Sequence, residues 1–195
     1  KEELEKAKMR KDSIALAESL LKDSLKTSPS EAYQDTLSPA NDSLATLAES
    51  VRFGAFASAA KGTNYEEVLE NDLVRITFSS KGGTIREVLL KKHYKTVRDT
   101  NGKDTKELVK MLNSPNNRFE YRLPVKGSAT GTVSTSELFF TASKQGNTVT
   151  FRAPTTNGGY FEQKYTLAPD NYIVDYSIAA KNLGDILGQG QKSLD

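Results

Sequence analysis

The sequence predicts a mostly β protein, an antiparallel sandwich preceded by a helical or flexible stalk. Three observations support this class. Apolar residues alternate with polar ones along short segments after residue 63, which is typical of strands with one buried face. Polar turns containing glycine, asparagine or proline separate these segments. No apolar pattern of helical period lies between them, which disfavours a doubly wound α/β fold.

Residues 1–62 are expected to form the stalk and residues 63–195 the sandwich domain. Residues 1–26 are rich in good helix formers, and Ile14, Ala17, Leu20, Leu21 and Leu25 form one apolar stripe. The stripe fits a solvated helix, or a helix that docks on a partner or a second copy. A low-hydrophobicity stretch follows, in which we expect short helices within a flexible linker.

A helix start signal lies at Ser38-Pro39, because proline is favoured at the first helical position. Apolar residues then follow at helical spacing: Leu44, Leu47, Ala48 and Val51. The next segment, 53–62, is small and apolar and too short to span a bilayer. We expect Phe53 and Phe56 to cover part of the sheet.

The segment from Glu70 to Lys92 predicts a β-hairpin at the start of the folded domain. Val74, Ile76 and Phe78 alternate with polar residues, and a glycine-bearing loop at 79–83 tolerates positive φ. The full set of expected strands is Tyr65–Glu70, Leu73–Ser79, Thr84–Lys92, Glu107–Leu112, Arg118–Leu123, Glu137–Ala142, Thr148–Ala153, Tyr160–Leu167 and Tyr172–Lys181. Ala168-Pro-Asp-Asn171 supplies the turn between the last two.

Composition argues against catalysis. The chain has 195 residues, a net charge of +2, no cysteine and one histidine, His93. Disulfides, cysteine nucleophiles, cysteine-ligated zinc and paired-histidine metal sites are therefore excluded, and no Gly-x-Ser-x-Gly motif accompanies His93. We expect no catalytic, cofactor-binding or metal-binding residues and no nucleic-acid partner. No run of about 18 apolar residues occurs. The first residue is Lys, so we expect a fragment or processed product.

Several short motifs are expected to have structural roles. Lys81-Gly-Gly-Thr84 and Gly188-Gln-Gly190 lack the spacing of a phosphate-binding loop. The basic run Lys91-Lys-His-Tyr-Lys95 is interpreted as a solvated strand end, with anionic lipid contact as the alternative. The acidic residues Glu66, Glu67, Glu87, Asp170 and Asp175 show no spacing of a calcium loop or glycosidase pair. Aromatic residues at 160, 161, 165, 172 and 176 fit a core better than a ligand groove.

Two blocks carry a family resemblance. The segment from Val68 to Tyr94, with its Lys-Gly-Gly hairpin, resembles the opening of the periplasmic domain of YidC-type membrane protein insertases. The match continues through Gly159–Tyr176 and Ala180–Gly184, and Phe53-Gly-Ala-Phe56 resembles forms from the Bacteroidetes-like branch.

The resemblance implies a β-supersandwich of galactose-mutarotase-like shape on the periplasmic side of the bacterial inner membrane. It implies no enzyme activity and no cofactor. The implied partners are nascent inner-membrane proteins and Sec translocon components, with a membrane anchor in the full-length protein. The insertase groove belongs to helices absent from this sequence, so no partner-binding residue can be carried over.

In the family, further strands follow the region matching 184–195, so this chain would hold about the first half of the domain. A half-sandwich leaves apolar faces and strand edges uncovered. We therefore expect a homodimer, strand exchange or a locally different closure. Two alternative functions remain open at this point, a carbohydrate- or polymer-binding sandwich and a mutarotase-like epimerase, the latter disfavoured by the single histidine.

Overall fold

The computed structural model describes residues 39–112 and 118–187, with side chains described from Ser43 onward. These residues belong to one compact unit, Pro39–Asp195. The expected stalk helix at 1–26 and the Gly188–Gly190 motif lie outside the described residues. Among the described residues, no helix has both the length and the apolar character needed to cross a membrane.

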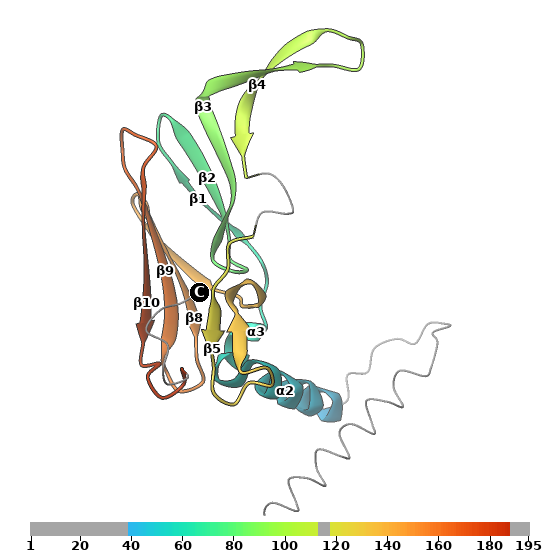
Figure 1. Ribbon diagram of the computed structural model, residues 1–195, viewed down its shortest axis with the longest axis vertical. Helices are drawn as coiled ribbons and strands as arrows, with labels where there is room; N and C mark the ends of the chain where they lie inside the picture. Colours follow the sequence, from blue (N-terminus) through green and yellow to red (C-terminus); the bar gives the residue numbers. More distant parts are fainter. Residues whose placement is uncertain (1–38, 113–117, 188–195) are drawn as a thin grey trace, which may run out of the picture. The chain divides into compact units, whose positions relative to one another are not determined.

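Two four-stranded antiparallel sheets form the body of the unit (Figure 1). The first has the order β1-β2-β3-β4, from strands Glu66–Glu70, Val74–Ser79, Thr84–Arg98 and Asp104–Met111. The second has the order β10-β9-β8-β7, from strands Val174–Lys181, Tyr160–Leu167, Thr148–Pro154 and Thr141–Gln145. A short pair completes the strands, β5 (Arg122–Pro124) with β6 (Thr132–Ser134). The mostly β, antiparallel sandwich predicted from the sequence is confirmed.

Aromatic side chains join the two sheets. Phe78 of β2 lies with its ring centroid 5.8 Å from that of Phe151 in β8 and 4.8 Å from that of Tyr165 in β9. All three side chains are buried, and Phe161 adds a fourth ring. The alternation that predicted β9 therefore reflects a buried face, and Phe161 and Tyr165 are core residues as expected. The same expectation is wrong for Tyr172, which is 44% exposed because it lies in the turn before β10.

The helical segments precede the sheets. They are α2 (Pro39–Phe53), η1 (Gly54–Phe56) and α3 (Ala57–Ala60). α2 begins at the proline that the sequence indicates, and Phe53, Phe56 and Ala59 are buried core members, which confirms the expected covering role of Phe53 and Phe56. The predicted division after residue 62 stays a prediction for residues 1–38. The described residues 53–60, however, pack with the sandwich core.

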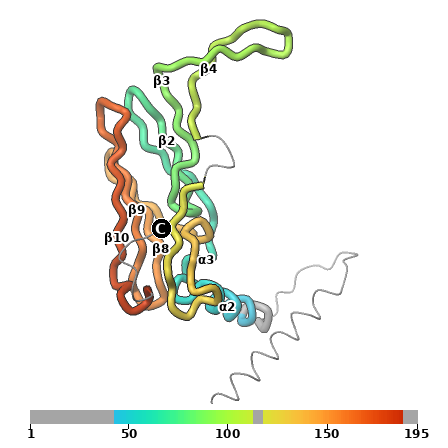
Figure 2. Tube along the Cα trace, viewed as in Figure 1, coloured from blue at the N-terminus to red at the C-terminus, as the bar shows by residue number. Residues whose placement is uncertain are grey.

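The hairpin of β2 and β3 is confirmed, but β3 is longer than expected. Past Leu90 the register shifts, so Leu90 pairs with Val109 and Tyr94 with Leu108, leaving residues 91–93 without β4 partners. Beyond the shift, β3 and β4 pair only with each other and extend as a two-stranded ribbon (Figure 2). The basic run 91–95 is therefore the middle of a strand rather than its end, because β4 supplies a partner that begins at Asp104.

The region 118–145 differs most from expectation. The predicted strand Glu137–Ala142 is wrong: a short 3-10 helix, η2 (Thr135–Glu137), comes first and β7 begins only at Thr141. The apolar residues alternate there because alternate side chains are buried, although the segment does not continue a strand pairing. Its backbone bonds to separate segments instead: Phe139 N donates to Ala59 O and Phe140 N to Ser80 O. The predicted strand Arg118–Leu123 is replaced by the shorter β5, and β6 was not foreseen.

Candidate functional site: an apolar groove between the sheets

A groove of about 370 Å³ lies between the inner faces of the two sheets. One wall comes from β2 and β3 and consists of Val74, Ile76, Ile85, Val88 and Leu90. The other side is lined by Val174 of β10 and by Tyr172 in the turn before it. Val74 and Ile76 are fully buried, whereas Ile85, Val88 and Leu90 are only half-buried. Part of the apolar face of the first sheet is thus left for a further occupant.

The rim of the groove combines flexible and polar groups. Met111, at the end of β4, is 48% exposed, and Tyr172 is 44% exposed. Nε2 of His93 and the hydroxyl of Tyr172 share a hydrogen bond of 3.1 Å across the two sheets. Methionine adapts to irregular apolar surfaces. A rim of this kind suits an apolar occupant whose side chains vary.

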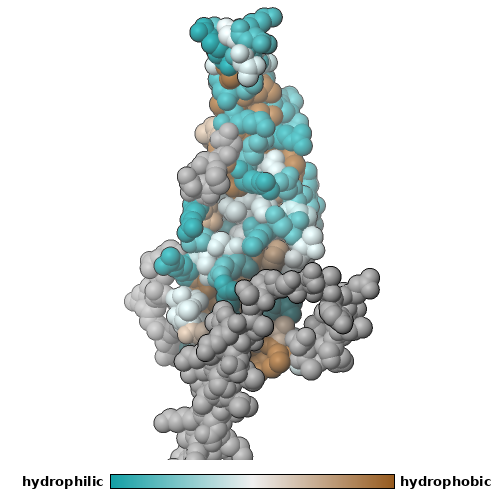
Figure 3. Space-filling view, turned by 90° about the vertical axis from the view of Figure 1, so that its right-hand side faces the viewer, coloured by the Kyte–Doolittle hydropathy of each residue, from teal (hydrophilic) through white to brown (hydrophobic). Residues whose placement is uncertain are grey.

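Three larger hollows lie elsewhere on the described surface, but their linings are more polar than that of the groove. Figure 3 shows one face on which hydrophilic residues dominate and hydrophobic residues form small, separate patches. The acidic residues Glu66 and Glu87 lie in exposed ion pairs with Arg86 and Lys110. Such pairs contribute little to stability. Asp170 and Asp175 are exposed.

The glycine turn of the hairpin joins the sheets through a buried group of hydrogen bonds. Gln163 Nε2 donates to the carbonyl oxygen of Gly82 (2.8 Å), and the Tyr165 hydroxyl donates to that of Gly83 (2.9 Å). The Tyr176 hydroxyl donates to Gln163 Oε1 at 2.9 Å. We call these five residues the inter-sheet cluster.

The inter-sheet cluster explains the two glycines. Gly82 and Gly83 have φ of +85° and +62°, and a Cβ on Gly83 would lie 2.8 Å from Gln163 Nε2. Burial raises the pKa values of Tyr165 and Tyr176 well above the usual range, so both hydroxyls stay protonated donors. The cluster is structural, and the phosphate-loop reading of Lys81–Thr84 finds no support in its geometry.

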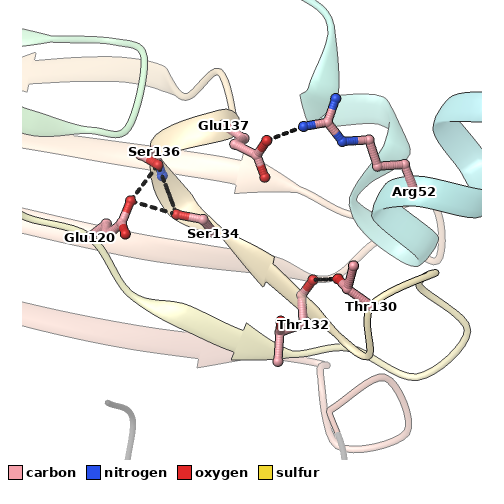
Figure 4. Close-up of polar contacts among 7 residues, drawn as sticks. All are labelled: Arg52, Glu120, Thr130, Thr132, Ser134, Ser136 and Glu137. Carbon is pink, nitrogen blue, oxygen red and sulfur yellow. Dashed lines mark hydrogen bonds and ion pairs between the residues drawn. The ribbon is translucent and has the colours of Figure 1, made fainter.

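A second polar group lies near η2 (Figure 4). Ser134 and Ser136 both donate to Glu120 Oε2, at 2.9 and 2.6 Å, and Glu137 pairs with Arg52 of α2. Hydrogen bonds from Ser136 and Ser134 lower the pKa of Glu120. A carboxylate with a lowered pKa is a weak general base near neutral pH. This arrangement therefore does not form an activated nucleophile. It was not predicted from the sequence, because a Ser-x-Ser spacing is not distinctive.

The described residues contain no group of three or more histidine, cysteine or acidic side chains placed to hold a metal ion. What the fold presents instead is an apolar groove with an open rim on a rigid β framework. These features define the class: an antiparallel β-sandwich domain with an apolar groove between its two sheets.

Comparison with known families agrees with this class. Residues 67–192 match the family described as the YidC periplasmic domain, and the chain belongs to that family. Proteins named membrane protein insertase YidC are 34% identical in Parabacteroides distasonis, over 79% of this chain and 24% of that protein, and 32% identical in Cytophaga hutchinsonii, over 87% and 26%. One from Chlorobaculum parvum is 29% identical over 80% and 27%.

The chain spans about a quarter of the length of these curated relatives. No solved structure matches it. The family resemblance read from the hairpin and the β9–β10 region is confirmed, including its Bacteroidetes-like character. The curated relatives in question are named membrane protein insertases, not enzymes. The comparisons give no support to the sugar-binding or epimerase alternatives.

Proposed function

We propose that this chain is the periplasmic part of a bacterial inner-membrane insertase and that it aids the insertion and folding of inner-membrane proteins. The observation that carries the proposal is the family match over residues 67–192. In that setting residues 1–38 are part of the stalk that leads from a membrane anchor.

The groove suggests how the domain takes part. Insertase clients have apolar segments and extended periplasmic loops, and the groove offers an apolar wall with half-buried Val88 and Leu90 and an adaptable Met111 at its rim. Displacing water from such a surface favours binding of an apolar segment by about 25 cal/mol per Å² buried. Nascent inner-membrane proteins are the proposed occupants, and Sec translocon components are the proposed docking partners of the outer surface.

Site-specific photo-crosslinking in the full-length insertase tests this role. A photo-reactive residue at Met111 is expected to crosslink to nascent inner-membrane proteins, while the same residue at Thr105, on the ribbon of the same strand, serves as the control. Adding Val88→Asp should abolish the Met111 product, and Thr96→Asp, outside the groove, should not. Equal crosslinking from positions 105 and 111 would contradict the proposed role of the groove.

Self-association of the chain, also expected from the sequence, is a separate part of the proposal. It needs an uncovered surface with the chemistry to pair with itself.

A further inference from the structure

The turn between β9 and β10, residues 168–173, supplies Tyr172 to the groove, and we call this turn the flap. Figure 1 shows it at the same end of the unit as the turn between β1 and β2. The two turns belong to different sheets. Contacts between them therefore set how far apart the two walls of the groove stand at this end.

Asn71, in the turn between β1 and β2, anchors the flap. Its Nδ2 donates to the carbonyl oxygens of Ala168 and Asn171, both at 2.8 Å. Its Oδ1 accepts from the backbone N–H groups of Leu73 and Val74, at 2.8 and 2.9 Å. An asparagine amide has two N–H donors and an oxygen with two lone pairs, so this side chain uses its full hydrogen-bonding capacity. One residue thus fixes its own turn and holds the flap of the other sheet.

The irregularity in β3 contacts both turns. Residues 91–93 have no partners in β4. Nζ of Lys91 donates to the backbone carbonyl oxygen of Asn71 at 2.7 Å. His93 reaches the flap instead, through its hydrogen bond to Tyr172. The extra residues of β3 therefore contact the anchor of the flap at one point and the flap itself at another.

The side of the flap that faces β3 is held through Tyr172. Its hydroxyl shares the 3.1 Å hydrogen bond with His93 Nε2, and the two ring centroids are 5.8 Å apart. Both residues are exposed, and both line the groove. Within the described ranges this is the one hydrogen bond between β3 and the flap. We call it the latch. It bridges the two walls, so a segment that enters between them has to part it.

The two attachments of the flap differ in strength. The anchor consists of two hydrogen bonds from the half-buried Asn71, and the flap adds a bond of its own from Ala168 N to Ile173 O. The latch is a single hydrogen bond between exposed side chains, whose polar groups bond to water when it opens. A hydrogen bond that is exchanged for bonds to water contributes little net stability. Opening of the latch is therefore the easier of the two movements.

We propose that the flap controls entry to the groove. Asn71 is a positioning residue that holds the flap in place, and the latch between Tyr172 and His93 opens when an apolar segment binds. This inference rests on the proposed role of the groove and extends it by naming how entry is regulated.

Removal of the latch should strengthen binding to the groove. Tyr172→Phe keeps the ring and deletes the hydroxyl, so an unstructured peptide of alternating leucine and serine should bind the 195-residue chain roughly fivefold more tightly in a nuclear magnetic resonance titration. Tyr94→Phe is the matched control, because Tyr94 is 61% exposed and does not line the groove. In a chain that carries His93→Ala, Tyr172→Phe should add nothing, because the latch is already absent.

Removal of the anchor should have the opposite effect. Asn71→Asp keeps the acceptor within its own turn but loses both donors to the flap. Binding must then order the flap again, so we expect roughly tenfold weaker peptide binding. The contact between the rings of Tyr172 and His93 should also be lost, as measured by nuclear Overhauser effects without any peptide. Asn101→Asp, in the turn before β4, introduces the same charge and should change neither quantity.

Three results would overturn the proposal: no gain in affinity from Tyr172→Phe, a gain that persists in the presence of His93→Ala, or a ring contact that survives Asn71→Asp. The second result would indicate a more apolar wall rather than an opened latch. Absence of peptide binding by the original chain would contradict the proposed role of the groove instead. The ring contact in Asn71→Asp would then still decide whether Asn71 positions the flap.

Discussion

Replacing Gly83 with alanine tests the inter-sheet cluster, because this glycine combines a positive φ with a close approach to the other sheet. At φ +62° a side chain costs about 1–2 kcal/mol in backbone strain. The new Cβ would also lie 2.8 Å from Gln163 Nε2 and 3.2 Å from Phe151 Cβ. Moving Gln163 leaves the Gly82 carbonyl without this hydrogen bond, and a buried unpaired group costs about 1–3 kcal/mol.

Gly102 provides the matched control. It has φ +77°, but a Cβ there meets nothing within 4 Å. Gly102→Ala should therefore lower the free energy of unfolding by about 1–2 kcal/mol, through backbone strain alone, and Gly83→Ala by about 2–5 kcal/mol, always by more than Gly102→Ala. The chain has no tryptophan, so urea unfolding followed by far-UV circular dichroism is the assay. Equal losses for the two variants would refute the close approach between the turn and β9.

Three further predictions concern the same framework. Gln163→Leu should destabilise the unit by about 2–4 kcal/mol, because it removes the central side chain of the inter-sheet cluster. Tyr176→Phe should destabilise it by about 1 kcal/mol, because it removes only one hydrogen bond of the cluster. Similar losses of the two variants in urea unfolding would contradict this. Because the pKa of Glu120 is lowered in the folded chain, its carboxylate stabilises the fold above the unfolded-state pKa of 4.5, and this stabilisation is lost as the pH falls through the lower folded pKa. The original chain should therefore be more stable than Glu120→Gln at pH 7 but not in acid. A difference in the free energy of unfolding that persists in acid would contradict this. Phe56→Ala should lower the free energy of unfolding by about 3–5 kcal/mol because the side chain is fully buried. Leu47 is 61% exposed, so Leu47→Ala should change it by less than about 0.5 kcal/mol. A small effect at Phe56 would mean that residues 53–60 belong to the stalk and not to the core.

Local sequence signals predicted the elements that local forces determine. The glycine pair at 82–83 identified the β2–β3 turn because positive φ has a strong residue preference. Alternation at Phe161, Tyr165 and Leu167 identified β9, since its buried face contacts the core along its whole length. Pro39 identified the first residue of α2.

Long-range contacts explain the rest. Leu138 and Phe140 alternate like a strand, but their neighbouring backbone groups bond to Ala59 and Ser80, far away in the sequence. The extension of β3 to Arg98 depends on pairing with β4 across the 99–103 turn. No local sequence pattern predicts backbone partners that are so distant in the sequence.

The groove was missed for the same reason. Its wall residues, such as Val88 and Leu90, read as ordinary core positions in the sequence. Met111 reaches its rim from the end of β4 and Tyr172 from the turn between β9 and β10, and His93 lies at an irregularity in β3. Only the packing of the two sheets shows that this core is incompletely filled.

The most direct measurement of the central claim is a titration of the isotope-labelled 195-residue chain with an unstructured peptide of alternating leucine and serine, followed by nuclear magnetic resonance. If the groove binds apolar segments, the signals of Ile85, Val88 and Met111 should shift saturably, and Val88→Asp should abolish the shifts while Thr96→Asp leaves them intact. Shifts that spread evenly over the surface, or that survive Val88→Asp, would contradict a binding role for the groove.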